Sequence, residues 1–156
     1  MPSTAGTEDL SITIAERIQT LFQALNEVDP KRVFFGRTYE IDPIEMPCAD
    51  IELGPDVPVD QQQSKHQSAL QTIYLDLYDQ RNDSEALIKC AKYKALGFYA
   101  IMQDYTLGLP FVLDTTYGGA QEPASDADAG LPGWTMRVAF LVHYRFNDDD
   151  RTVFTG

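Results

Sequence analysis

Apolar and polar side chains alternate strictly over residues 133–147, GWTMRVAFLVHYRFN. The odd positions are mixed and mostly polar, whereas every even position is apolar or aromatic: Trp134, Met136, Val138, Phe140, Val142, Tyr144 and Phe146. A period of two residues predicts a β-strand with one face in a core and the other nearer water. On this assignment Phe140→Ala costs about 3 kcal/mol or more of folding stability, and Arg137→Ala, on the opposite face, costs little.

A first helix is predicted after residue 10 by apolar residues at helical spacing. Thr13 with Glu16 forms a capping-box pattern, and Ser11 is the alternative N-cap. Pro30 closes the helix, because proline cannot donate a backbone hydrogen bond. The apolar stripe, with Phe22 at its edge, comprises Ile14, Ile18, Leu21, Leu25 and Val28.

A second helix is predicted from Asp83 or Ser84, both favourable N-caps, to about residue 104. Its outer side carries Lys89, Lys92 and Lys94. Each helix has one apolar face, so both are expected to lie against the even face of the long strand and its neighbours. The stripe of the second helix comprises Leu87, Ile88, Ala91, Ala95, Phe98, Tyr99 and Met102.

Shorter strands are predicted at residues 48–53, 70–78 and 109–117, the last forming a terminal hairpin with 133–147. Residues 33–35 fit either a short strand or a buried turn. Because the helices are few and not regularly interleaved with strands, the order indicates an α+β fold. We expect a mainly antiparallel or mixed sheet of about four strands with two helices on one face. One domain should span residues 1–156, with tails at 1–8 and 148–156.

Two long polar segments interrupt these elements. Residues 54–68, GPDVPVDQQQSKHQS, and 118–132, GGAQEPASDADAGLP, are rich in proline, glycine or small polar residues. At about fifteen residues, each reaches a length at which unstructured loops in compact domains become uncommon. Both are predicted to be mobile until a partner orders them.

The chain is strongly acidic, with 24 Asp and Glu against 12 Lys and Arg and a net charge of −12. This balance argues against stable nucleic-acid binding, which needs a basic surface, and against docking on an anionic membrane. No apolar run approaches the roughly 18 residues of a membrane span. Cys48 and Cys90 match no ligand spacing, which favours two reduced thiols in a soluble protein made in a reducing cytoplasm.

No catalytic motif is recognisable. His66 and His143 are interpreted as satisfied or exposed structural residues, and Gly118 with Gly119 lacks the lysine and helix of a phosphate-binding loop. The aspartates at 126, 128 and 148–150 lack the calcium-loop pattern and are interpreted as solvated surface. We therefore predict no catalytic residue, no metal site and no cofactor.

Tyr74 and Tyr78 share one strand face with Thr72 and Asp76. Tyrosine suits half-buried strand positions, and it is also favoured at protein interfaces; both interpretations stay open. The residues predicted to form an interface lie on this face, on the odd face of the last strand and in the two polar segments. They are Asp56, Val57, Val59, Tyr74, Tyr78, Tyr117, Glu122, Asp126, Asp128, Arg137 and Arg145.

The order of elements resembles the tail terminator proteins of long-tailed phages, also called minor tail or tail completion proteins. The resemblance spans roughly residues 10–147: a helix, the proline-led strand 47–53, a loop, the alternating strand 70–78, an amphipathic helix and a terminal hairpin. It rests on element order and not on a diagnostic motif. It implies a homo-oligomeric ring, usually a hexamer, that ends the tail tube and binds the head connector, without catalysis or cofactor. DNA passes through the hole of such a ring.

Two alternatives stay open. One is another neck or head-completion protein of a virion, which shares most of these features. The other is a small-molecule or metal-binding enzyme domain with a site between the two long loops, near Asp114, Asp126 or Asp128.

Overall fold

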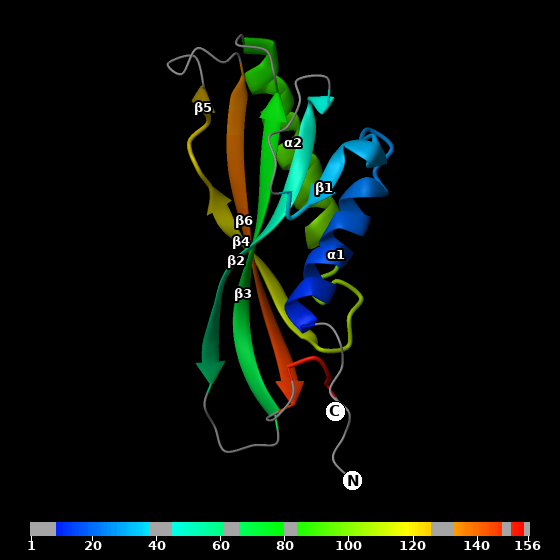
Figure 1. Ribbon diagram of the computed structural model, residues 1–156, viewed down its shortest axis with the longest axis vertical. Helices are drawn as coiled ribbons and strands as arrows, with labels where there is room; N and C mark the ends of the chain where they lie inside the picture. The colour runs from blue at the N-terminus through cyan, green and yellow to red at the C-terminus, as the bar shows by residue number, and fades with distance from the viewer. Residues whose placement is uncertain are drawn as a thin grey trace.

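The strand predicted from the alternating pattern, β6 (Trp134–Asn147), lies inside the sheet (Figure 1). The computed structural model describes residues 9–37, 45–60, 66–79, 84–125, 133–147 and 151–154. β6 pairs along its whole length with β3 (His66–Asp79) and, on its other side, with β4 (Val112–Ala120). The prediction for its even face is confirmed, because all of these residues are buried except the half-buried Trp134.

The sheet has the strand order β1-β2-β3-β6-β4. β1 (Val33–Phe35) runs parallel to β2 (Cys48–Asp60), and the other neighbours are antiparallel. The short β5 (Ala124–Ser125) pairs with β6 beyond the end of β4. The α+β class and the terminal hairpin of β4 with β6 are therefore confirmed, and residues 33–35 form a strand rather than a buried turn.

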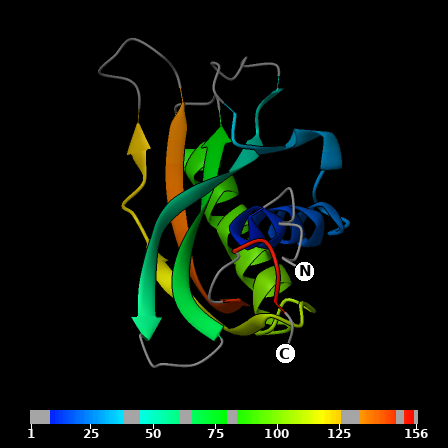
Figure 2. The same cartoon turned by 60° about the horizontal axis from the view of Figure 1, so that its bottom comes forward.

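Two helices, α1 (Leu10–Gln23) and α2 (Ser84–Met102), cover the same side of the sheet, as predicted (Figure 2). A short 3₁₀ helix, η1 (Pro30–Arg32), leads into β1. The predicted start of α1 is wrong, because Asp9 is the N-cap and accepts a hydrogen bond from the Ser11 amide at 2.8 Å. α1 also ends at Gln23, well before Pro30, and Phe22 is buried in the core.

The apolar stripe predicted to pack α2 against the core is wrong. Ile88 is 65% exposed, Tyr99 59% and Phe98 44%. The buried side of α2 is formed by smaller residues together with one isoleucine: Ala86, Cys90, Gly97, Ala100 and Ile101.

Close approach of α2 to the sheet explains this orientation. A Cβ atom built on Gly97 would lie 2.6 Å from Cδ2 of Leu75 in β3, which is closer than two carbon atoms can come. Small residues on the inward side let the helix axis lie near the sheet, where large ones would hold it away. The spacing of apolar residues in the sequence indicates which side of a helix is more apolar, but it does not indicate how close the helix axis lies to the sheet.

The predicted loop at residues 54–68 is also largely wrong. β2 continues to Asp60, and β3 begins at His66. β1 pairs β2 only at residues 49–51, so the later part of β2 is an edge strand, where Pro55 and Pro58 need not donate to a neighbour. Register shifts between Leu53 and Asp56 and between Pro58 and Asp60 accommodate these prolines.

The second predicted loop, residues 118–132, is shortened in the same way. β4 continues to Ala120 and β5 follows at 124–125, while Asp126 and Asp128 lie outside the described residues. The two predicted loops belong to opposite ends of the sheet, because Ser68 pairs with Arg145 near the end of β6, whereas Ser125 pairs with Trp134 at its start. Eleven strand residues separate these ends by about 35 Å.

Candidate interaction surface

The sheet face opposite the helices, which we call the open face, carries a cluster of charged side chains. Strand alternation places them there, because the odd residues of β3 face α2 and the even residues face away. The pairing registers bring β2, β3 and β6 side by side. The cluster comprises Asp50, Glu52, Tyr74, Asp76, Tyr78 and Arg137.

Arg137 is the centre of this cluster. Its Nε and Nη2 atoms donate to Oδ1 and Oδ2 of Asp76, both at 2.7 Å, and Nη2 also donates to Oε2 of Glu52 at 3.0 Å. The guanidinium lies over the ring of Tyr74, 4.2 Å from its centroid. A bidentate, charge-assisted pair that also stacks on an aromatic ring is a rigid arrangement. The hydrogen bond and charge of Asp76 raise the pKa of Arg137 above its usual value.

Asp50 adds a buried carboxyl group beside this pair. Burial is the main cause that raises its pKa to about 6, and the neighbouring Glu52 and Asp76 raise it further, while the Arg37 amide opposes the shift. Burial also raises the pKa of Tyr78, helped by Asp76, so its phenol is neutral at physiological pH. Two carboxylates, of Asp76 and Glu52, thus contact the guanidinium of Arg137, and Asp50 adds a third carboxyl group to the same face, so the cluster is acidic overall.

A hollow of about 240 Å³ lies at one end of this cluster. Gln121 and Glu122, which follow β4, form one wall, and the Gln121 amide donates to the Arg137 carbonyl at 2.8 Å. The hollow is smaller than the roughly 300 Å³ at which ligand pockets begin, and its lining combines polar and charged groups with apolar surface. The remaining lining residues are Asp76, Tyr78, Ala124, Thr135, Met136 and Arg137.

Four of the predicted interface residues therefore come together here: Tyr78, Glu122 and Arg137 line the hollow, and Tyr74 supports Arg137 from below. Sequence reasoning missed Asp50, Glu52 and Gln121. The alternation of Asp50 and Glu52 with apolar neighbours in β2 is a signal that would have placed both on the same face as Asp76.

The other predicted interface residues lie elsewhere. Val57 and Val59 are 53% and 50% exposed on the edge of β2, and Arg145 is exposed near the end of β6. Tyr117 lies on the helix side of the sheet, with its ring 5.4 Å from Phe98 and 6.0 Å from Phe140.

Asp56 belongs to a contact that joins both ends of the chain. It accepts hydrogen bonds from the hydroxyl of Tyr144, at 3.1 Å, and from Arg151. Arg151 also forms an ion pair with Asp9, the N-cap of α1, at 3.5 Å. The carboxylate of Asp56 is therefore bound within the subunit, whereas the side chain of the neighbouring Val57 is exposed.

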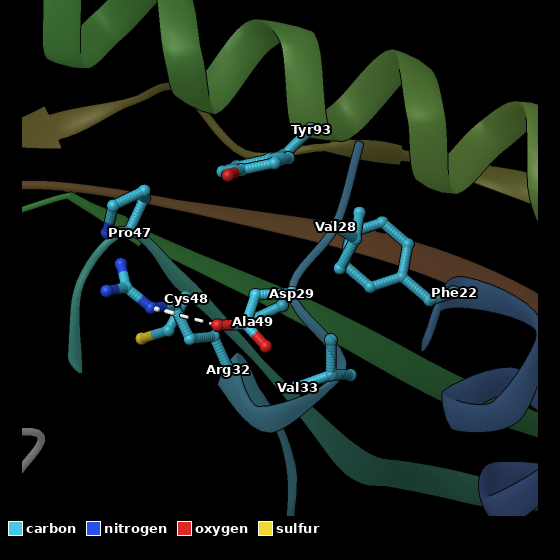
Figure 3. A pocket seen from close by; sticks show the side chains of 9 residues that line it. All are labelled: Phe22, Val28, Asp29, Arg32, Val33, Pro47, Cys48, Ala49 and Tyr93. Atoms are coloured by element: carbon cyan, nitrogen blue, oxygen red, sulfur yellow. Dashed lines mark ion pairs between the residues drawn. The ribbon is translucent and has the colours of Figure 1, made fainter. Parts of the chain in front are cut away.

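A second cavity lies between η1, α2 and the start of β2 (Figure 3). Its accessible space of about 10 Å³ holds at most about one water molecule. Figure 3 shows Cys48 near Arg32, which pairs with Asp29 at 3.7 Å. Burial raises the pKa of Cys48 to about 12, so its sulfur is a thiol and a poor nucleophile at neutral pH.

The proposed enzyme site between the two long loops is wrong in its geometry, because these segments lie at opposite ends of the sheet. Asp114 is exposed on β4, whereas burial raises the pKa of Asp50 on the open face, away from Asp114. Within the described ranges, no group of three or more His, Cys, Asp or Glu side chains is placed to hold a metal ion. Asp126, Asp128 and residues 148–150 are outside these ranges.

Neither histidine is shown in a catalytic arrangement. The Nε2 atom of His143 is buried and has no hydrogen-bond partner among the residues that the structure describes, so the expectation of a satisfied or exposed histidine is wrong for this atom. The side chain of His66 is outside the described part. No helix in the described segments is long and apolar enough to cross a membrane.

Comparison with known proteins gives a likeness of fold. No family model matches the chain, and no curated protein matches its sequence. Among solved structures, the fold is similar to a chain of the "Virion of native gene transfer agent (GTA) particle", with a TM-score of 0.60 and 10% sequence identity. The match covers 86% of this chain and 98% of that chain, so nearly the whole α+β architecture is shared.

Proposed function

We propose that this chain is a structural protein of a phage-like virion, and specifically a tail terminator. Copies of the chain form a ring, a hexamer, on the end of the tail tube; the ring stops tube growth and binds the head connector or neck protein. The observation that carries the proposal is the likeness, over nearly the full length of both chains, to a component of a gene transfer agent virion.

The distribution of surfaces along the sheet supports this role. The exposed edge of β2 at Val57 and Val59 and the segment around Glu122 lie toward opposite ends of β6, separated by roughly 20–30 Å. One subunit can therefore contact two different partners at once, such as the tube and the connector. The predicted interface residues Asp126 and Asp128 follow Glu122 in sequence and lie outside the described residues.

The charge of the chain fits a ring through which DNA passes. A net charge of −12 repels phosphate, so DNA slides through the hole without stable binding. In this role the protein needs no cofactor and carries out no reaction, and it is assembled in the host cytoplasm before it joins the virion.

The direct test is capping of tail tubes. The purified chain is mixed with tubes that polymerise from the tube protein of the same virion, and negative-stain images record tube length and tube ends. We expect added density at one end and tubes that stop growing. Tubes that keep growing, with bare ends, would contradict the terminator role. Binding to connectors but not to tubes would instead identify a neck or head-completion protein.

A charge placed on the β2 edge sharpens this test. Val57→Asp should weaken capping if this edge meets the tube, because it puts a carboxylate into an apolar contact. Asn26→Asp, which adds the same charge at an exposed position after α1, is the matched control. Equal capping by both variants would exclude the β2 edge from the tube contact.

A further inference from the structure

The solvent side of α2 carries large apolar side chains that the subunit itself does not cover. Ile88, Phe98 and Tyr99 are 65%, 44% and 59% exposed, and Tyr117 of β4 extends the same surface beside Phe98. Apolar groups of this size clustered on one surface mark a contact site more often than a free surface. The opposite side of α2 packs tightly on the sheet. Both sides of α2 are therefore suited to packing, one against the sheet and the other against a partner.

Lysines accompany these apolar residues. Lys89, Lys92 and Lys94 lie within one and a half turns of α2, on a chain that has only 12 basic residues in all. Lys89 and Lys92 are exposed, and no ion pair joins any of the three to a residue in the described segments. The solvent side of α2 is therefore a basic and apolar surface on an acidic protein.

The hollow of the open face has the opposite charge and lies on the opposite layer of the molecule. Asp76 and Glu122 line it, and Glu52 adjoins it. The guanidinium of Arg137 also lines it and is hydrogen-bonded to Asp76 and Glu52. Ala124 and the ring of Tyr78 give it apolar walls as well. Its volume of about 240 Å³ suits one or two protein side chains rather than a free ligand.

We propose that the solvent side of α2 in one copy docks on the open-face hollow of the next copy. Ile88 contacts the apolar walls and Lys92, one turn further along α2, approaches Glu122 and Asp76. Tyr99, about 16 Å from Ile88 along the helix, contacts the open face beside the hollow. The occupant is a second copy because the complementary charge is on the same chain. Copies of charge −12 repel one another unless their basic and acidic surfaces meet. Two different surfaces on opposite layers form a head-to-tail contact, which closes into a ring when the rotation between copies allows it.

This inference rests on the proposed ring and assigns the surfaces that build it. Cysteine cross-linking tests it directly, because the native Cys48 and Cys90 are only 3% and 1% exposed. A chain with Lys92→Cys and Glu122→Cys, oxidised mildly at high protein concentration, should form a ladder of disulfide-linked dimers, trimers and larger species. Lys31→Cys with Glu122→Cys, in which Lys31 is exposed on η1, is the control and should not form the ladder. Equal ladders, or none in either variant, would overturn the proposal.

Charge exchange gives a second, independent measurement. Lys92→Glu alone and Glu122→Lys alone should each raise the dissociation constant of self-association by about tenfold, measured by analytical ultracentrifugation. The double variant should restore association, because each contact again joins opposite charges. Lys31→Glu, with the same change of net charge as Lys92→Glu, should associate like the wild type. Failure of the double variant to recover would overturn the pairing of these two surfaces.

The tube-capping experiment separates this inference from the proposed function. If Lys92→Glu weakens both self-association and tube capping and the double variant restores both, the proposed function and the assigned subunit contact both stand. If the wild type and all variants cap tubes equally well and none forms the cross-linked ladder, the terminator role stands and the assigned subunit contact is wrong.

Discussion

Arg137 of β6 donates a hydrogen bond to each carboxylate oxygen of Asp76 in β3, both at 2.7 Å. The two residues are direct partners in the antiparallel register, although 61 positions separate them in sequence. The side chain of Asp76 is only 6% exposed, so its carboxylate has lost most of its hydration. The ion pair with Arg137 offsets most of that desolvation cost. Because of this pair, residues of the open face contribute to the free energy of unfolding, as the buried residues of the opposite face do.

Arg137→Ala should lower the free energy of unfolding by about 2 kcal/mol, because it leaves a nearly buried carboxylate without its cation. The alternating pattern alone predicts little cost, and the structure revises that expectation. Arg145→Ala, an exposed position on the same face of β6, should change stability by less than about 0.5 kcal/mol. Urea denaturation followed by circular dichroism measures both; similar values for the two would show that the pair is not stabilising.

Phe140→Ala should cost about 3–5 kcal/mol, because the ring is fully buried and its removal leaves a cavity. Phe98→Ala is the matched control. It deletes the same side chain from the solvent side of α2, where the ring is 44% exposed and loses mainly its edge contact with Tyr117. Its cost should stay below about 1.5 kcal/mol. A larger loss for Phe98 than for Phe140 would mean that the faces are wrongly assigned.

Gly97→Ala should destabilise the protein by about 1–3 kcal/mol, although alanine is the better helix former. The added methyl would lie 2.6 Å from Cδ2 of the fully buried Leu75. In a Leu75→Val background, which removes that atom, the same change should cost little or become stabilising. Thermal unfolding of the four chains gives the coupling between the two positions, and the absence of coupling would contradict the close approach of α2 to the sheet.

Asp50 should make stability depend on pH. Its folded-state pKa of about 6 lies above the ordinary value of 3.8. Between these values the folded state binds more protons than the unfolded state, so raising the pH from about 4 to 6 should lower the free energy of unfolding. The loss of stability is on the order of 3 kcal/mol. It is complete above about pH 6, where the buried carboxyl group is ionised, and does not arise below about pH 4, where the group is protonated in both states.

Asp50→Asn should remove this dependence, so that its stability relative to the wild type rises between pH 4 and pH 7.5. Asp114→Asn, on exposed β4, supplies the matched control for loss of one charge. Denaturation curves at the two pH values measure the difference for each variant. An Asp50→Asn variant that parallels the wild type across this range would show that Asp50 is ionised in the fold without cost.

Several parts of the fold could be predicted from sequence because they depend on local periodicity. The even face of β6, the hairpin of β4 with β6 and the alternation in β3 are visible in the spacing of apolar residues. The strand character of residues 54–60 was hidden, because the prolines at 55 and 58 argue for a loop unless the segment is known to be an edge strand. The candidate site could be predicted only in part. The alternation of apolar and polar residues predicts the strand face of Tyr74, Tyr78 and Arg137, but their contact with Glu52 depends on the register between strands.

The sequence by itself determined the α+β class, the long central strand and the acidic balance, since each is a property of composition or of neighbours two to four residues apart. Only the tertiary structure decided which side of α2 meets the sheet, which carboxylates surround Arg137 and where the two polar segments lie. The physical reason is that helix-to-sheet distance and strand register are set by all packed elements together. A helix stripe of small residues becomes the inward one only when the sheet beneath it is close enough to exclude larger side chains.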